Sequence, residues 1–451
     1  MFFPTLKKTG LERITVTDFP GLDRRESAQV NGFREMENLC SDGYPALRTR
    51  QARALVAETA KPNGLTAKDA LIWVDGGQIY VGGLAAGPQL TDGEKSLVSM
   101  GAYLVVFPDK IYLNTKDLSD YGSLECRKTA AAGVGISLCD AEGTAYSDVV
   151  ESEGAPEEPE EGALWMDVSG AVPVLRQFSQ DCWTAMQNVC VKLQATGLGK
   201  GFAAGDGVTV SGCGVERLNG ETVLQAVGED WVVFPGTVAV STEQEEPVTI
   251  YRYVPEMDFV VQSGNRLWGC KYGMVDGETV NEIYASKLGD FKNWRCFQGL
   301  STDSYAAARG SDGVFTGAVS YLGNPIFLKE RCMERVYAAD SGAHQIVTTE
   351  CSGVQKGSEK SLQVVGGVLY YLSGDGVQAF DGSLPVTVSQ VLGEKRCHGG
   401  VGGAWRGKYY LSALDEEEAA SLLVYDSERR QWHREDGLRA TAFVGSGGEL
   451  Y

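Results

Sequence analysis

Short apolar strands alternate with glycine-containing turns over most of this chain, and this alternation limits its fold more than any other feature. The clearest case is FVVQSGNRLWGCKY, in which Phe259 to Gln262 and Arg266 to Tyr272 flank the turn Ser263-Gly264-Asn265. Glycine and asparagine tolerate the positive φ angles of a tight hairpin turn. We therefore predict a β-hairpin here, completed to a four-stranded unit by strands at Glu282 to Ser286 and at Phe291 to Phe297.

One four-stranded sheet cannot bury its own apolar faces, so similar units must stack against it. Comparable turns occur at Asp75-Gly76-Gly77, Pro108-Asp109, Gly323-Asn324, Gly366-Gly367, Arg406-Gly407 and Ser446-Gly447. From Gly264 onward these turns lie about 40 to 60 residues apart, which is the period of four-stranded propeller blades. The predicted fold is all-β, a β-propeller of about six four-stranded blades, with five to seven compatible with the pattern.

The predicted blades cover residues 70–121, 251–297, 305–350, 361–390 and 398–434, and a sixth is split between the chain ends. Because the chain stops within a hairpin at Tyr451, we expect a strand at residues 11–17 to close the last blade and remove the open sheet edges.

The expected domains are an extended N-terminal arm (residues 1–65), a first propeller segment (66–125), an insertion (126–247) and the remaining blades (248–451). Within the insertion, the Glu- and Pro-rich run from Glu151 to Ala163 is expected to be a mobile linker or loop. The alternating strands that follow, from Gln187 to Val248, predict a small β-barrel or sandwich.

The formal net charge of −20 argues against a surface that grips nucleic acid, because phosphate binding depends on Lys and Arg. The charge is compatible with an acidic wall past which DNA slides, and equally with simple solubility. Eleven cysteines without a C-x-x-C pair suggest free thiols in a reducing cytoplasm. No apolar run approaches the roughly 20 residues of a membrane helix, so we expect a cytoplasmic protein when it is made.

Several motifs resemble functional sites, but a structural role explains each of them better. GLGKGF (Gly197 to Phe202) lacks the Ser or Thr and the following helix of a phosphate-binding loop, so we interpret it as a loop of the insertion. The three histidines, His344, His398 and His433, have no zinc-site spacing. LDEEEAAS (Leu414 to Ser421) reads as a solvated hairpin turn. We predict no catalytic, cofactor-binding or metal-binding residue and no cofactor.

Three stretches resemble the packaged-DNA stabilisation proteins of short-tailed phages and related prophage propellers. GGVLYYLSGDGVQAFDGSLPVTVS and GNRLWGCKYG followed by NEIYASKLGDFKNW are similar to their blades, and FREMENLCSDGYPALRTR is similar to their arm. The resemblance covers about two thirds of the chain and leaves the insertion unmatched. It implies a non-enzymatic structural protein of a phage or prophage virion, located in the bacterial cytoplasm before assembly.

The resemblance further implies a neck or tail ring or adaptor that helps to retain packaged DNA or to extend the portal channel. The expected partners are portal, adaptor or other tail proteins and further copies of the chain in a homo-oligomeric ring. We expect no specific nucleic-acid binding, although packaged DNA passes nearby, and no membrane.

Two other functions stay open at the level of sequence. A carbohydrate-binding propeller similar to a tail adhesin would expose aromatic side chains on one face, whereas burial of Trp268, Trp294 and Trp405 would argue against it. A propeller glycoside hydrolase would need two opposed carboxylates in a deep funnel.

Overall fold

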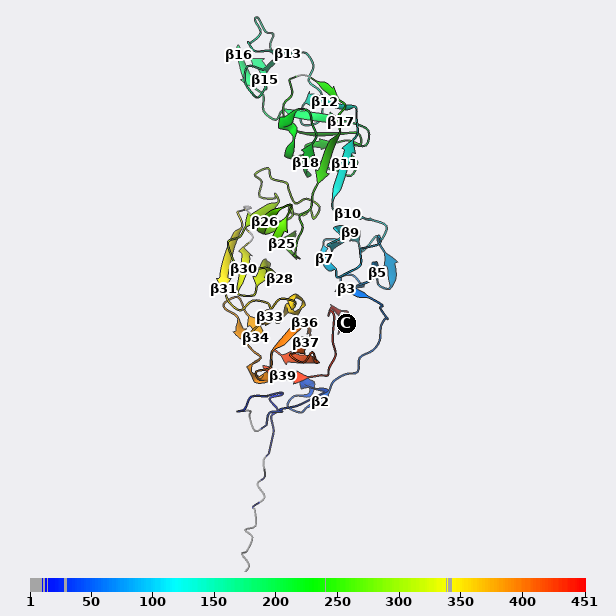
Figure 1. Cartoon of the computed structure of the whole chain (residues 1–451), viewed down its shortest axis with the longest axis vertical. Helices are drawn as coiled ribbons and strands as arrows, with labels where there is room; N and C mark the ends of the chain where they lie inside the picture. Colours follow the sequence, from blue (N-terminus) through cyan, green and yellow to red (C-terminus); the bar gives the residue numbers. More distant parts are fainter. Residues whose placement is uncertain are drawn as a thin grey trace, which may run out of the picture. The chain divides into compact units, whose positions relative to one another are not determined.

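The computed structural model describes residues 10, 13, 15–27, 31–239, 241–337, 339 and 343–451. It forms two compact units: unit 1 is Met1–Ala67 with Leu328–Met333 and Glu350–Tyr451, and unit 2 is Lys68–Phe327 with Glu334–Thr349. Strands dominate both units (Figure 1). The helices of the described residues are four single 3-10 turns: η1 (Ser41–Gly43), η2 (Glu216–Leu218), η3 (Glu359–Ser361) and η4 (Gln390–Leu392). The prediction of an all-β chain is confirmed.

Among the described residues, six sheets of four strands lie outside the insertion, each with its strands in chain order. The first three consist of β3 (Pro62–Ala67), β4 (Leu71–Asp75), β5 (Gln78–Val81) and β6 (Leu84–Ala86); β7 (Ser96–Met100), β8 (Tyr103–Phe107), β9 (Ile111–Asn114) and β10 (Tyr121–Ser123); and β24 (Phe259–Ser263), β25 (Arg266–Val275), β26 (Glu278–Ala285) and β27 (Tyr305–Ala308). The other three consist of β28 (Phe315–Tyr321), β29 (Asn324–Lys329), β30 (Cys332–Tyr337) and β31 (Gln345–Glu350); β32 (Gln363–Val365), β33 (Val368–Ser373), β34 (Gly376–Phe380) and β35 (Val386–Thr387); and β36 (Cys397–Trp405), β37 (Lys408–Asp415), β38 (Ala420–Asp426) and β39 (Gln431–Arg434).

The predicted hairpin around Gly264 is confirmed. Ser263 pairs with Arg266 across a two-residue turn, in which Gly264 has φ 58° and Asn265 has φ 56°. The fourth strand of this sheet was predicted wrongly: it is β27, not residues 291–297. Phe291, Trp294 and Phe297 are three residues apart, so they cannot share one face of a strand, whose side chains alternate with period two. They lie instead in the loop between β26 and β27.

The segment predicted as one blade over residues 70–121 forms two sheets, β3–β6 and β7–β10. The prediction recognised the apolar central strands and missed outer strands such as β6 and β10, which are short and partly exposed. Outside the insertion, the described residues contain six complete four-stranded sheets, the number of blades predicted. The sixth is not the split blade: β40 (Gly445–Ser446) and β41 (Glu449–Leu450) form a two-stranded sheet. Arg13 and residues 15–17 lie in no strand, and residues 11, 12 and 14 are outside the described residues.

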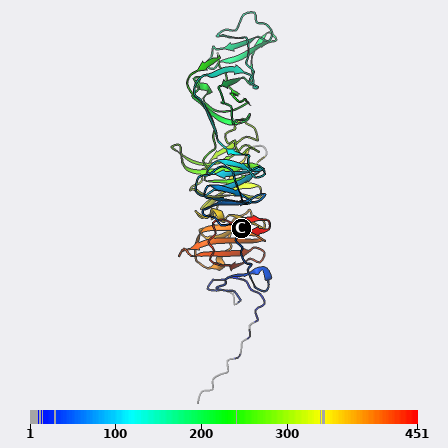
Figure 2. The ribbon, with the colours of Figure 1, turned by 90° about the vertical axis from the view of Figure 1, so that its right-hand side faces the viewer.

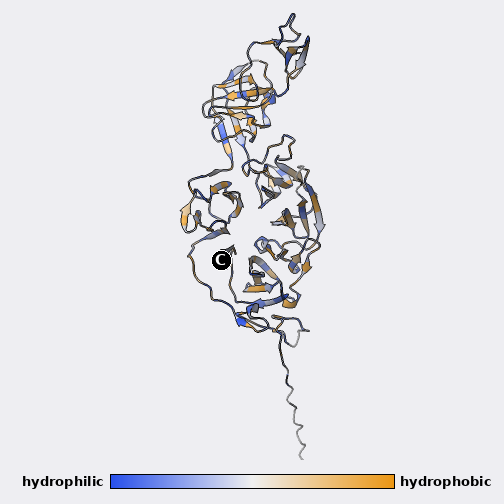
Figure 3. Cartoon of the chain, turned by 180° about the vertical axis from the view of Figure 1, so that it is seen from behind, coloured by the Kyte–Doolittle hydropathy of each residue, from blue (hydrophilic) through white to orange (hydrophobic). Residues whose placement is uncertain are grey.

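Consecutive sheets pack face to face within each unit, and central strands such as β8, β33 and β37 are buried over most of their length. Figure 3 colours the strands by hydropathy and shows apolar residues in the strands of both units. In unit 2, Ile72 and Val74 of β4 pack against Leu104 of β8, and Trp268 of β25 packs against Phe327 of β29. In unit 1, Tyr370 of β33 stacks on Tyr409 of β37 with ring centroids 5.4 Å apart. This is the packing that stacked four-stranded blades require.

The insertion begins and ends with two strands that pair with each other, β11 (Cys126–Ala130) and β23 (Val248–Arg252). Its end is therefore at Arg252, a few residues beyond the predicted 247. One sheet has the order β11-β23-β18-β19, with β18 (Gly207–Ser211) and β19 (Gly220–Val223). A second has the order β20-β21-β17-β12-β22, formed by β12 (Val134–Cys139), β17 (Cys190–Gln194), β20 (Ala226–Val227), β21 (Trp231–Pro235) and β22 (Thr242–Gln244). The two sheets share one apolar core, as the predicted barrel or sandwich requires.

A third sheet of the insertion lies beyond these two in Figure 1 and was not predicted. It consists of β13 (Val149–Ser152), β14 (Leu164–Asp167), β15 (Val174–Ser179) and β16 (Cys182–Ala185), with β13 parallel to β14. The Glu- and Pro-rich run is therefore not a linker between domains. It is the loop that connects two paired strands of one small sheet.

Candidate functional site

The N-terminal arm is bound to the outer strand β39 of unit 1. Gly21 forms a parallel bridge to Trp432, and the Leu22 amide donates to the Trp432 carbonyl at 2.7 Å. The Asn38 amide donates to the Glu435 carbonyl at 2.8 Å. Gly21 has φ 81°, and a Cβ added there would lie 2.3 Å from the Trp432 carbonyl oxygen, so a side chain does not fit. The arm thereby covers backbone groups of an edge strand, which would otherwise attract another chain. In Figure 2 it lies beside the strands of this sheet.

Two apolar side chains anchor the arm in the core of unit 1. Leu22 and Met36 are buried in the cluster formed by sheets β32–β35 and β36–β39. Trp432 is fully buried in the same cluster and donates its indole hydrogen to the Val388 carbonyl at 2.8 Å. The arm is therefore part of the core and contributes to the stability of these sheets.

A cluster of polar side chains lies beneath η1 of the arm. The Ser41 hydroxyl donates to Asp426 Oδ2 at 2.6 Å, and Lys408 Nζ donates to Asp42 Oδ1 at 2.5 Å. The bond from Lys408 holds the pKa of Asp42 below its usual value. Burial opposes ionisation of Asp426, but hydrogen bonds from Ser41 and from Arg429 outweigh it and lower its pKa. Burial, reinforced by the Lys408 charge, lowers the pKa of the neighbouring His433 to about 4, so this histidine is neutral near pH 7.

Two arginines of the arm form ion pairs with the two residues that follow β39. Arg53 contacts Asp436 at 2.6 Å and Glu435 at 2.8 Å, and Arg50 contacts Asp436 at 3.1 Å. The Arg53 side chain is 40% exposed, so water and salt screen its ion pairs.

A buried ion pair lies at the base of the insertion, where its chain joins the sheets of unit 2. Arg252, the last residue of β23, contacts Asp206 with Nη1 and Oδ2 2.5 Å apart, and both side chains are almost completely buried. Arg252 also donates to the carbonyls of Leu124 and Gly201, each at 3.1 Å. Burial raises the pKa of Asp206, although Arg252 acts in the opposite direction. The bond to the Leu124 carbonyl joins the end of β23 to the segment that leads into β11.

A buried asparagine makes a second attachment. Asn293, in the loop between β26 and β27, donates to the Gly205 carbonyl at 2.6 Å and accepts from the Gly207 amide at 3.0 Å. A Cβ added to Gly207 would lie 2.1 Å from the Arg295 carbonyl oxygen, so glycine is required by close backbone contact. The insertion is thus seated on this loop as well as joined by its two connecting strands.

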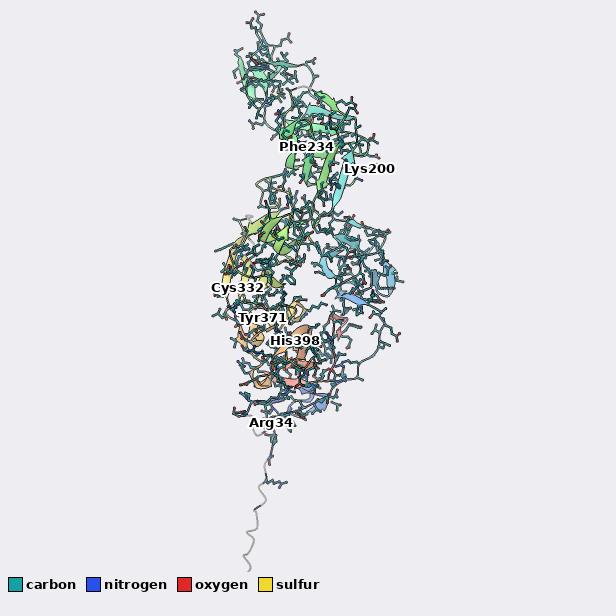
Figure 4. The ribbon with its side chains drawn as sticks, in the orientation of Figure 1. Arg34, Lys200, Phe234, Cys332, Tyr371 and His398 are labelled. Atoms are coloured by element: carbon teal, nitrogen blue, oxygen red, sulfur yellow. The ribbon has the colours of Figure 1, made fainter. Side chains whose placement is uncertain are left out.

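Two of the predicted candidate motifs contribute to these attachments, because Gly201 accepts from Arg252 and His433 lies in the polar cluster under the arm. Gly197 to Phe202 is a turn of the insertion, followed by β18 and not by a helix. Lys200 contacts Glu229 at 2.8 Å, and the Gly197 amide donates to Asp230, so carboxylates occupy the places where a phosphate would bind. Figure 4 labels Lys200 on this loop and Phe234 within the neighbouring strands.

The three histidines have separate surroundings. His344 accepts from the Ala339 amide and packs edge-on against Trp268 and Tyr305, and burial lowers its pKa. His398 is in β36 and lies 3.1 Å from Glu418, which is at the turn between β37 and β38. His433 belongs to the polar cluster under the arm.

The run Leu414 to Ser421 forms that same turn, in which Asp415 accepts from the Glu417 and Ala419 amides. Over the part of the chain that the structure describes, no three or more His, Cys, Asp or Glu side chains are grouped as a metal site. No helix among these residues is long and apolar enough to span a membrane.

Both attachments were missed by sequence reasoning. Two features of the sequence could have indicated them. Leu22 and Met36 are apolar residues in a mostly polar arm, and Arg252 ends VTIYR, a strand in which apolar and polar residues alternate. Their partners are hundreds or tens of residues away, so no local pattern pairs them.

No family model and no curated protein matches the sequence. Among solved structures the chain is similar to the phage phi92 endosialidase, with a TM-score of 0.26 and 9% identity over 86% of this chain and 60% of that one. It is also similar to PorZ, a surface component of the type-IX secretion system of Porphyromonas gingivalis, with a TM-score of 0.17 and 10% identity over 86% of this chain and 61% of that one. The chain thus spans about 60% of the length of these two proteins. At these scores the similarities identify neither a family nor a function.

Proposed function

We propose that this chain is a non-enzymatic structural protein of a phage or prophage virion, a neck or tail ring or adaptor that helps to retain packaged DNA or to extend the portal channel. In this proposal the six four-stranded sheets are blades of one propeller. The observation that carries it is the run of face-packed sheets in each unit, fastened at β39 by the arm. Such a body suits a rigid structural part, and the resemblance of its blades and arm to phage propellers supplies the setting.

Induced particles test the proposal directly. In the bacterium that carries the gene, an epitope-tagged copy should co-purify with DNA-filled particles through a density gradient. Deletion of the gene should give particles whose DNA becomes accessible to nuclease, with capsid protein unchanged. Absence of the tagged chain from particles that contain portal and capsid protein would refute the virion role.

A carbohydrate-binding role is a second candidate, and one observation favours it. Trp73 and Tyr80 stack on the face of β4 and β5 opposite to the core, with centroids 5.3 Å and planes 10° apart, and both are partly exposed. Against it, Trp268 and Trp294 are buried, and Trp405 is packed beside Phe443 and Leu450. A glycan array probed with the wild type and with Trp73→Ala would separate the two roles, since a sugar platform loses binding in the variant.

The hydrolase alternative gains no support from the buried carboxylates. Asp206 has a raised pKa, as an acid catalyst would, but its partner is the Arg252 guanidinium and not a second carboxylate.

A further inference from the structure

Among the exposed large apolar side chains of unit 2, four come from neighbouring turns. They are Leu288, Phe297, Leu300 and Leu322, with exposed fractions of 43%, 50%, 58% and 65%. We call them the apolar strip. Scattered exposed leucines are ordinary, but a group of them on adjoining loops is typical of a binding surface.

Hydrogen bonds join the segments that carry the strip. The Ser263 hydroxyl donates to the Gly323 carbonyl at 2.9 Å, which links the β24–β25 turn to the β28–β29 turn beside Leu322. The Gly289 amide donates to the Asn265 carbonyl at 2.9 Å, and the Leu288 amide donates to the Thr302 carbonyl at 2.9 Å. The three segments therefore form one continuous surface.

A buried arginine holds the loop of the strip in place. Arg266 donates to the carbonyls of Ser286, Asp303 and Ser301 at 2.7, 2.5 and 2.9 Å. The Asp303 carboxylate accepts from the amide of Leu300 at 3.0 Å. A loop fixed in this way loses little conformational entropy when it binds a partner.

Leu322 is at a position that is unusual for leucine. It has φ 49° at the first position of the two-residue turn, where Asn, Asp or Gly is favoured. Its side chain is exposed, so the conformational cost brings no burial within this chain. A partner that covers Leu322 would supply that burial.

The charges around the strip differ from those of the rest of the chain. The loop between β26 and β27 has three basic residues, Lys287, Lys292 and Arg295, against Asp290 and the buried Asp303, in a protein of net charge −20. Lys287 and Arg295 also contact the insertion, at the Gly205 carbonyl and at Glu221. A partner that complements it is acidic and has apolar side chains of its own.

The third sheet of the insertion has both properties. Residues 149–185 contain eight carboxylates, Glu151, Glu153, Glu157, Glu158, Glu160, Glu161, Asp167 and Asp181, and one basic residue, Arg176, which pairs with Asp167. Val150 on the edge strand β13 and Val172 in the β14–β15 turn are 51% and 59% exposed. We define the acidic tip as β13, the loop of residues 153–163 and Val172.

We propose that the apolar strip of one copy of this chain binds the acidic tip of a second copy. Strip and tip are different surfaces, so the contact is head-to-tail, and it yields a ring when the rotation between copies closes. The inference rests on the proposed ring-forming role and names the surfaces that form the ring.

Sedimentation velocity of the purified full chain over a range of concentration tests the contact. The wild type should associate, and salt should weaken the association because charges contribute to it. Leu300→Asp in the strip, and the triple change Glu157→Gln, Glu158→Gln and Glu160→Gln in the tip, should each raise Kd by about tenfold or more. Leu322→Asn should also weaken association while it leaves the chain equally or more stable, since asparagine suits this turn.

Mixing the two kinds of variant gives the sharpest result. The Leu300→Asp chain keeps its tip and the glutamine triple variant keeps its strip, so an equimolar mixture should form dimers and nothing larger. Leu84→Asn, at a leucine that is 66% exposed in β6, is the matched control and should associate like the wild type.

A wild type that stays monomeric, variants that associate normally, or a mixture without dimers would each overturn the proposal. The virion role is measured separately, by the presence of the chain in particles. A chain found in virions whose strip variants still associate refutes the contact alone.

Discussion

The arm of unit 1 and the insertion of unit 2 are both added to face-packed sheets, but they are attached by different interactions. The arm uses backbone bonds to an edge strand, two apolar anchors and partly exposed ion pairs. The insertion uses an almost completely buried ion pair at its base, whose Arg252 also bonds to the Leu124 carbonyl, and a buried asparagine. Exposed charges are screened by salt, whereas buried ones are screened much less. We therefore expect salt to weaken the attachment of the arm more than that of the insertion.

Removing Arg252 should have the largest effect. Arg252→Ala leaves the Asp206 carboxylate buried without its cation, and breaking such a pair costs about 3–5 kcal/mol. Urea denaturation followed by circular dichroism measures the loss in the free energy of unfolding. The double variant Arg252→Met with Asp206→Leu removes both charges and should recover most of that loss. A single variant as stable as the wild type would show that water reaches Asp206.

Shortening the main arm anchor should cost about 3 kcal/mol, because Leu22→Ala leaves a cavity in the core of unit 1. The arm should then be cut sooner by trypsin at Arg24 and Arg25. Leu55→Ala, at a residue that is 77% exposed, is the control and should change neither stability nor cleavage. Unchanged cleavage in Leu22→Ala would mean that polar contacts alone hold the arm.

Acid should weaken unit 1 through His433. Its pKa is about 4 in the folded protein and 6.5 as a free side chain, so the unfolded chain binds more protons between these values. Stability should be constant above pH 6.5 and fall by about 3 kcal/mol as the pH drops to 4. The lowered pKa values of Asp42 and Asp426 add a further loss only below their usual value of 3.8.

Denaturation curves measured at a series of pH values check this prediction. His433→Gln should flatten the profile between pH 6.5 and 4, whereas His398→Gln, at a partly exposed side chain of β36, is the control and should leave it unchanged. If the free energy of unfolding of His433→Gln still fell steeply between pH 6.5 and 4, other titratable groups would be responsible for the loss of stability.

Removing Arg53 should have the smallest effect, at most about 1 kcal/mol, because its ion pairs are partly exposed. The difference between wild type and Arg53→Ala should shrink further in high salt. This measurement sharpens the comparison, since Arg252→Ala should lose the same free energy at low and high salt. If Arg53→Ala lost the same free energy of unfolding at low and high salt, the arm and the insertion would not differ in their sensitivity to salt.

The sequence predicted the central hairpins because their signals are local. Gly264 and Asn265 adopt the positive φ angles that the turn chemistry demands, and the flanking strands pair across the turn as expected. The outer strands β6 and β10 have only three residues each, which is too short for a periodic pattern to mark a strand.

The attachments of the arm and of the insertion could not be predicted from local sequence patterns, for a different reason. Asp206 and Arg252 look like surface charges in the sequence, and their burial depends on packing between β23, the loop near Gly201 and Leu124. Likewise, the sheet β13–β16 was hidden because the glutamate run between β13 and β14 dominates the local composition. Pairing with β15 and β16 stabilises the β13–β14 pair in spite of that loop.

The contact between Ser41 and Asp426 has a consequence for biosynthesis. The two residues are 385 positions apart, so at translation rates of 5–20 residues per second the arm waits roughly 20–80 s for its binding surface to leave the ribosome. During that interval Leu22 and Met36 have no native core to enter. The first segment to be synthesised is therefore among the last to reach its final place, and a nascent chain arrested before β39 presents an arm that chaperones can recognise.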